Sequence, residues 1–94
     1  MMYVKCEVRR YLEKTVEYND KKTGEPKSFV QRQLKVELEN GSDIYLSVND
    51  KLATEENIKY LEELRGQMVS APFWLKHKDK YLNYNLSDMP ELEA

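Results

Sequence analysis

The sequence predicts a small, mostly β protein with one helix, and three features of the chain support this prediction. Apolar and polar residues alternate along several short segments, as in strands with one buried face. A helical period appears only once, over residues 54–64. The chain has 94 residues, of which 40% are hydrophobic, and this is enough for one domain with a modest core.

Two strands are predicted on either side of a loop near the N-terminus. The even positions of residues 2–8 are apolar, and this alternation continues weakly to Leu12. Residues 18–28 are rich in Asn, Asp, Gly, Pro and Lys and are expected to form a flexible loop. The even positions of residues 30–38 are again mostly apolar, so this segment is predicted to be the second strand.

A third strand and the helix come next. Asn40-Gly41 is a strong signal for a tight turn, and the apolar residues within 44–48 predict a strand after it. Thr54 can cap the helix that follows, because its hydroxyl can accept a hydrogen bond from a free backbone N–H. Gly66, two residues beyond the last apolar position of the helical pattern, is typical of a helix end.

The remaining sequence predicts two more strands and a tail. Residues 68–75 form the fourth strand, where Pro72 implies an edge or a bulge because proline cannot donate to a ladder. A loop over 76–80 leads to a fifth strand at 81–86. Residues 87–94 are polar and acidic and are expected to be flexible.

This order of elements is that of the OB-fold, a five-stranded Greek-key barrel, here with the helix between strands 3 and 4. Residues 1–86 are therefore predicted to be one OB-fold domain and residues 87–94 an acidic C-terminal tail. Proteins of this fold often bind oligonucleotides or oligosaccharides on the open face of the second and third strands.

Composition argues against several classes of protein. Cys6 is the only cysteine, so it is expected to pack in the core, and neither an internal disulfide nor a cysteine cluster for a metal is possible. His77 is the only histidine, and no metal-ligand cluster or activated nucleophile accompanies it. Membrane-spanning and signal-peptide patterns are lacking. We expect a soluble cytoplasmic binding protein that is not an enzyme and uses no cofactor or metal.

The charges are segregated along the chain, although the net charge is only −2. Residues 1–35 contain nine Lys or Arg and five Asp or Glu, whereas residues 36–75 contain three and eight. Residues 76–86 are basic again, with three Lys and one Asp. Such segregation can build a positive face on an acidic protein.

The first basic segment contains the main candidate site. Phe29 opens the second strand on its polar side, just after a loop with three lysines. Exposed aromatic rings stack on the bases of single strands, at about 1–3 kcal/mol per base, and lysines follow the phosphates. Glutamines such as Gln31 and Gln33 can bond to exposed base edges. The alternative is that Phe29 covers the mouth of the barrel and the lysines only solvate the loop.

The second basic segment is the predicted hairpin loop, with alternating lysines followed by Tyr81. It can reach over a bound strand, or it is a solvated hairpin with Tyr81 in the core. Trp74 is interpreted as an exposed residue at a subunit interface, with a core position as the alternative. The candidate nucleic-acid-binding residues are Lys21, Lys22, Lys27, Phe29, Gln31, Lys35, Tyr45, Lys76, Lys78, Lys80 and Tyr81, with Ser47 on the same face.

Several short matches to one family follow each other in order along residues 20–86. They are Gly24-x-Pro26-x-Ser28 in the loop, Val36-Glu37-Leu38 at the end of the second strand, Asn40 in the turn, a third strand running to Asp50, Gly66 before the fourth strand, and a lysine-containing hairpin with an aromatic residue near its end. In this order and spacing the chain resembles the single-stranded DNA-binding, helix-destabilising proteins of filamentous phages, the gene V protein family.

The resemblance implies an OB-fold that dimerises and coats single-stranded replication intermediates cooperatively. By position it implies that Phe29 replaces an apolar DNA-contacting residue, Lys22 a loop arginine and Tyr81 the aromatic residue of the hairpin tip. Two tyrosines of the family are replaced by Lys27 and Lys35. This departure implies weaker stacking and stronger electrostatics, or compensation by the tyrosines at positions 18 and 45.

The acidic tail resembles the C-terminal tips of other single-strand-binding proteins, which compete with DNA for the basic groove and recruit replication proteins. A solvated terminus is the alternative.

The sequence therefore predicts a homodimeric protein of phage or mobile-element origin that binds single-stranded DNA, with RNA as an alternative, in the cytoplasm of a host bacterium. The competing prediction is an OB-like module that binds a protein and no nucleic acid. An oligosaccharide ligand matches less well, because lysines outnumber tryptophan near the face.

Overall fold

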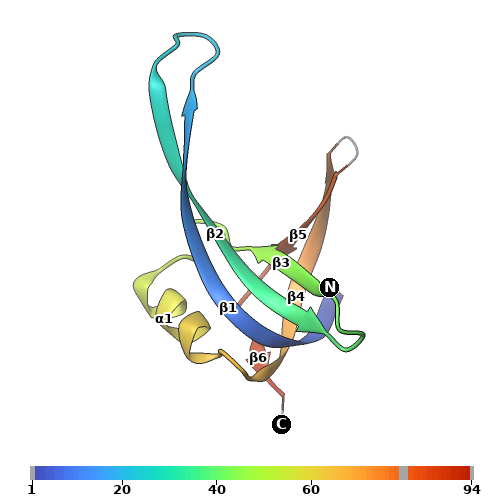
Figure 1. Ribbon diagram of the computed structural model, residues 1–94. Helices are drawn as coiled ribbons and strands as arrows, with labels where there is room; N and C mark the ends of the chain where they lie inside the picture. The colour runs from blue at the N-terminus through green and yellow to red at the C-terminus, as the bar shows by residue number, and fades with distance from the viewer. Residues whose placement is uncertain (1, 79–80, 94) are drawn as a thin grey trace.

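The computed structural model describes residues 2–78 and 81–93, and five of its strands close into a barrel of the OB-fold type (Figure 1). The elements are β1 (Met2–Asn19), β2 (Pro26–Leu38), β3 (Asp43–Ser47), α1 (Glu55–Glu63), β4 (Met68–Lys78), β5 (Tyr81–Leu86) and β6 (Glu91–Leu92). The strand order is β1-β2-β3-β5-β4, and a pairing of β1 with β4 closes the barrel. Neighbouring strands are antiparallel except β3 and β5, which are parallel. The predicted fold class and the position of the helix are confirmed.

A β-bulge in β1 decides which side chains of this strand face the core. Val8 lies opposite Val36, but the next pair joins Arg10 to Lys35, so Arg9 is an extra residue. Beyond the bulge the parity reverses: Tyr11 lies opposite the buried Leu34 and packs against the core. The even-numbered alternation predicted as far as Leu12 was therefore wrong after Val8.

The core is formed by the inward-facing residues of the strands and by one side of α1. Its buried members are Cys6, Val8, Leu34, Val36, Leu46, Val48, Leu61, Leu64, Val69, Ala71 and Leu86. The predicted burial of Cys6 is confirmed.

The helix has the predicted cap, since the Thr54 hydroxyl accepts a hydrogen bond from the Asn57 N–H at 3.2 Å. After the helix, Gly66 adopts a positive φ of 82° and donates its N–H to the Val8 carbonyl at 2.7 Å. This hydrogen bond connects the segment that follows the helix to β1, next to the bulge.

Two hairpins extend beyond the barrel (Figure 1). The β1–β2 ladder continues to the pair Asn19–Pro26, so only residues 20–25 form the connecting turn. The β4–β5 ladder continues to the pair Lys78–Tyr81. Flexible loops predicted over 18–28 and 76–80 were therefore too long, because pairing with a partner strand orders segments whose own composition is typical of loops. We call residues 14–31, none of which is buried, the long arm.

The C-terminal segment lies on the barrel, where the sequence predicts a flexible tail. Glu91 and Leu92 pair with β4 as strand β6, and the Tyr60 hydroxyl donates to the Pro90 carbonyl at 3.0 Å. Pro90 is buried and Met89 packs against the core. Two apolar residues within an acidic segment therefore attach it.

Pro72 occupies neither an edge strand nor a bulge. It lies where the partner on one side of β4 changes from β6 to β5, and there its carbonyl accepts a hydrogen bond from the Ser87 N–H at 3.0 Å. The missing N–H therefore removes no ladder bond.

Within residues 2–78 and 81–93, no helix is both long enough and apolar enough to span a bilayer.

Two weakly acidic groups, the buried thiol of Cys6 and the partly buried phenol of Tyr11, make the stability of the barrel sensitive to alkali. Burial raises the pKa of the Cys6 thiol to about 11. Burial, together with the hydrogen bond from the Tyr11 hydroxyl to Glu13, raises the pKa of the Tyr11 phenol. Both groups stay protonated and neutral in the folded protein at pH values where the same groups already ionise in the unfolded chain. The stability they contribute is complete below pH 9 and is lost as the pH rises through the folded pKa values.

We expect the urea midpoint of unfolding to fall between pH 8 and about pH 10.5, and to fall less in Tyr11→Phe. Tyr3, which is 59% exposed, provides the matched control: the urea midpoint of Tyr3→Phe should fall as much as that of the wild type. An equal fall in all three proteins would contradict this account.

Candidate nucleic-acid interface

The outer face of β2 and β3 brings together most candidates from the first basic segment. Since Leu34 and Val36 point inward, the odd positions of β2 point outward, among them Phe29, Gln31 and Lys35. Tyr45 lies directly opposite Lys35 and is 45% exposed. The Lys35 ammonium lies 6.0 Å from the Tyr45 ring centroid, within reach of a cation–π contact.

Strand β1 adds outward residues that the sequence did not reveal. Arg10 lies opposite Lys35, Lys14 opposite Gln31, and Val16 opposite Phe29. These positions face outward only because the bulge at Arg9 reverses the parity of β1. A bulge leaves little trace in a single sequence, and the adjacent charges of Arg9 and Arg10 at the break in alternation are the one local sign.

Phe29 lies on the long arm and not over the mouth of the barrel. Its ring is 5.9 Å from that of Tyr18, in an edge-to-face arrangement with an interplanar angle of 62°. Both rings remain about half exposed, at 50% for Phe29 and 47% for Tyr18. The two rings hold each other in place and leave area for a flat ligand.

A carboxylate organises the tip of the long arm. The Asp20 side chain accepts a hydrogen bond from the Lys22 N–H at 2.7 Å and forms an ion pair with the Lys27 ammonium at 2.8 Å. These contacts, the Lys27 contact foremost, hold the pKa of Asp20 below its usual range. Lys27 is thus partly neutralised, whereas Lys21 and Lys22 are exposed on the turn.

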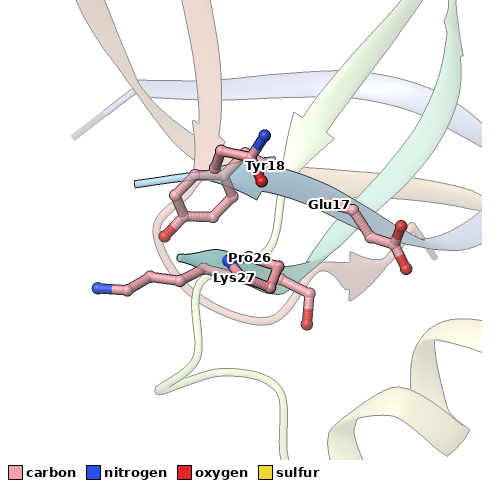
Figure 2. A pocket seen from close by; sticks show the side chains of 6 residues that line it. Glu17, Tyr18, Pro26 and Lys27 are labelled. Atoms are coloured by element: carbon pink, nitrogen blue, oxygen red, sulfur yellow. The ribbon is translucent and has the colours of Figure 1, made fainter. Parts of the chain in front are cut away.

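Figure 2 shows a shallow hollow just below this turn, lined by Glu17, Tyr18, Asn19, Pro26, Lys27 and Ser28. Tyr18 and Lys27 lie opposite each other in the ladder and project to the same side, while Glu17 projects away from them (Figure 2). The carboxylate of Glu17 is therefore kept off the side of the arm that carries the aromatic pair.

The outward positions of β1 to β3 between the arm and the middle of the barrel form one surface, which we call the basic face. Its members are Arg10, Leu12, Lys14, Val16, Tyr18, Lys27, Phe29, Gln31, Gln33, Lys35, Tyr45 and Ser47. Four of these twelve residues are cations and none is a carboxylate. In a protein with more acidic than basic residues, this is a marked local excess of positive charge.

The carboxylates of the same strands lie on the opposite side of the sheet or at the end of the strands away from the arm. At that end the Asp43 carboxylate lies 3.8 Å from the Lys35 ammonium and partly neutralises it. Glu13 points to the opposite side of the sheet. There the Arg32 guanidinium contacts the Glu13 carboxylate at 3.7 Å and the Asp50 carboxylate at 3.1 Å. At the end of β1 and β2 away from the arm, the Arg9 guanidinium bridges Glu7 at 2.7 Å and Glu37 at 3.4 Å.

The second basic segment is described only in part. Lys76 is exposed on β4, opposite Asn83. The backbones of Lys78 and Tyr81 pair at the end of the hairpin, but their side chains and all of Lys80 lie outside the described residues. Trp74 faces outward and is 43% exposed, so it does not belong to the core.

Among the residues that the structure describes, no three His, Cys, Asp or Glu side chains come together as ligands for a metal ion. No protein-family model, no curated protein and no solved structure matches the chain. The function proposed below therefore depends on the geometry of the basic face and on the chemistry of its side chains.

The role of Asp20 at the tip can be tested by proteolysis. In Asp20→Ala the turn loses its side-chain acceptor and its ion pair, so we expect trypsin to cleave after Lys21 or Lys22 several times faster than in the wild type. Glu17→Ala, which removes a nearby exposed carboxylate, should leave the rate unchanged. Equal rates in Asp20→Ala and the wild type would show that the carboxylate does not hold the turn.

Proposed function

We propose that the protein binds single-stranded DNA, with little sequence preference, along the basic face. The observation that carries the proposal is that exposed aromatic rings and cations share this one face. The carboxylates of the same strands lie on the opposite side of the sheet, as Glu13 does, or at the end away from the long arm, as Glu37 and Asp43 do. Stacking on Phe29, Tyr18 and Tyr45 favours unpaired bases, because only these expose their flat surfaces. The lysines and Arg10 would neutralise the phosphates that connect those bases.

The dimensions of the face suit a ligand of several nucleotides. From Arg10 to Tyr18 the strand β1 advances by about 27 Å, at about 3.4 Å per residue. This length is compatible with the site sizes of roughly 4–16 nucleotides found for single OB-folds.

In line with the resemblance to the filamentous-phage proteins, we propose that the protein is not an enzyme. It would coat replication intermediates of a phage or mobile element in the host cytoplasm, as a homodimer. Leu75 and Leu82 support a contact between copies, since they are 40% and 47% exposed on the side of the β4–β5 hairpin away from Trp74. Apolar residues exposed next to each other are a frequent mark of an interface.

The position of the C-terminal segment bears on the expectation that this segment competes with DNA. Its strand pairs with β4 at the end of the barrel opposite the two hairpin tips (Figure 1). Competition between the tail and DNA would therefore require β6 to leave β4. Recruitment of replication proteins stays a prediction for the exposed carboxylates Asp88, Glu91 and Glu93.

Direct titration tests the function. We expect fluorescently labelled oligo(dT) to bind and duplex DNA of equal length not to bind, with oligo(U) showing whether RNA is also accepted. The logarithm of the binding constant should fall with log salt by about 0.7 per phosphate neutralised. Absence of binding at low salt by a folded protein would overturn the proposal and favour the protein-binding module, whose apolar contacts would be far less sensitive to salt.

Substitutions on the two sides of the long arm locate the interface. We expect Phe29→Ala to raise Kd at least about fivefold, which corresponds to the loss of one stacked base. Val30→Ala is the matched control, because Val30 is the next residue, is 41% exposed and points to the other side. Equal effects of the two substitutions would contradict the assignment of the face.

The lysines of the basic face should not be equivalent. Lys14→Ala should weaken oligo(dT) binding more than Lys27→Ala, because Asp20 already neutralises part of the Lys27 charge. Lys14→Ala should also reduce the slope of the logarithm of the binding constant against log salt by about 0.7. Indistinguishable effects on Kd would show that the ion pair opens when the ligand binds.

A further inference from the structure

The outer face does not end at β3 but continues across β5 to β4. In the ladders, Gln33 lies opposite Ser47, Ser47 opposite Asn85, and Asn85 opposite Trp74. Residues directly opposite in neighbouring strands project to the same side of a sheet. Together with Leu12, which lies opposite Gln33, these residues form one outward row across all five strands of the barrel.

A second outward row lies beside the first, two residues further along each strand. It contains Arg10, Lys35 and Tyr45, then Asn83 and Lys76, which lie opposite each other. The ten residues of the two rows include three cations and two rings, Tyr45 and Trp74, that are 45% and 43% exposed. None of the ten is a carboxylate.

The rows have a clear limit. Beyond Lys35 and Tyr45 the next outward positions are Glu37 and Asp43, which lie opposite each other. Two carboxylates would repel a phosphate chain, so they bound the path on one side. The path that is left runs crosswise over β2, β3, β5 and β4, a distance of about 14 Å at about 4.8 Å between neighbouring strands.

We propose that Trp74 stacks on a base of the same bound single strand, and that Lys76 contacts a phosphate next to it. This inference rests on the proposed function and extends its ligand path from the basic face to β4. It assigns the exposure of Trp74 to a ligand and not to a second subunit. The outward neighbours of Trp74 in the two rows, Asn85, Asn83 and Lys76, are polar or charged, which suits a nucleotide better than an apolar protein contact.

The chain carries its own probe for this contact, because Trp74 is its only tryptophan. Saturating oligo(dT) should quench the tryptophan emission and reduce its accessibility to acrylamide, at a protein concentration where the oligomeric state does not change. Anisotropy of a labelled oligo(dT) would monitor binding independently. If the oligonucleotide binds and neither tryptophan signal changes, the inference is wrong and the proposed function stands.

Substitutions provide the second test. Trp74→Ala should raise Kd for oligo(dT) by about 5- to 150-fold with an unchanged salt slope, as expected for loss of stacking, and Trp74→Phe should retain most of the affinity. Lys76→Ala should instead reduce the salt slope by about 0.7. Met68→Ala is the matched control, since Met68 is 44% exposed on β4 but lies opposite Glu7, at the end of the strand away from Trp74; it should change Kd less than twofold.

The outcomes are distinguishable. If the wild type binds no oligo(dT), the proposed function fails. If it binds and Trp74→Ala behaves like Met68→Ala, only the present inference fails. If Trp74→Ala and Tyr3→Ala both dissociate a dimer in sedimentation equilibrium, Trp74 belongs to a subunit interface, because Tyr3 is the exposed apolar residue opposite Pro72, two residues from Trp74 on β4.

Discussion

The extra residue at Arg9 is the constraint on which the rest of the structure depends. It changes which side chains β1 buries along its length: before the bulge, where β1 pairs with both β4 and β2, the strand buries Cys6 and Val8, and after it Tyr11 takes the inward position. The same reversal sends Arg10 and Lys14 outward beside Lys35 and Gln31. Without the bulge, a strand as long as β1 would turn its cations to the other side of the sheet. Gly66 then fastens the end of the helical segment to Val8, next to the bulge.

Charge is sorted by the two sides of the sheet more than by segments of the chain. Glu13 lies between Leu12 and Lys14 in sequence, yet it faces Arg32 on the opposite side. The net charge of −2 therefore says little about any one surface. Local arrays of like charge act over about a Debye length, roughly 8–10 Å in physiological salt, so a phosphate near the basic face is affected mainly by its cations.

The sequence was informative where one period continued without interruption. The alternation in β2 and β3 identified Leu34, Val36 and Leu46 as core and placed Phe29 and Lys35 outside, and the change of period located the helix and its Thr54 cap. It was misleading where long-range pairing overrides local composition. The residues at 18–19 and 26–28 read as loop because of Asn, Pro and Lys, but they complete the ladder of the long arm. The bulge, and with it the contribution of β1 to the candidate site, depends on packing against two partners that no local window contains.

The C-terminal strand has a consequence for solubility. In its first half, β4 pairs with β1 on one edge, and β5 reaches its other edge only from Phe73 onward. Unpaired N–H and C=O groups on an exposed strand edge are a template for a neighbouring chain, and many β proteins block such edges. Here β6 occupies the edge at Val69 and Ser70, and the Glu93 N–H caps the Met68 carbonyl at 3.0 Å. The C-terminal segment thus blocks this edge of β4 against pairing with a strand of another molecule, and the carboxylates of Glu91 and Glu93 would repel the same edge of another copy.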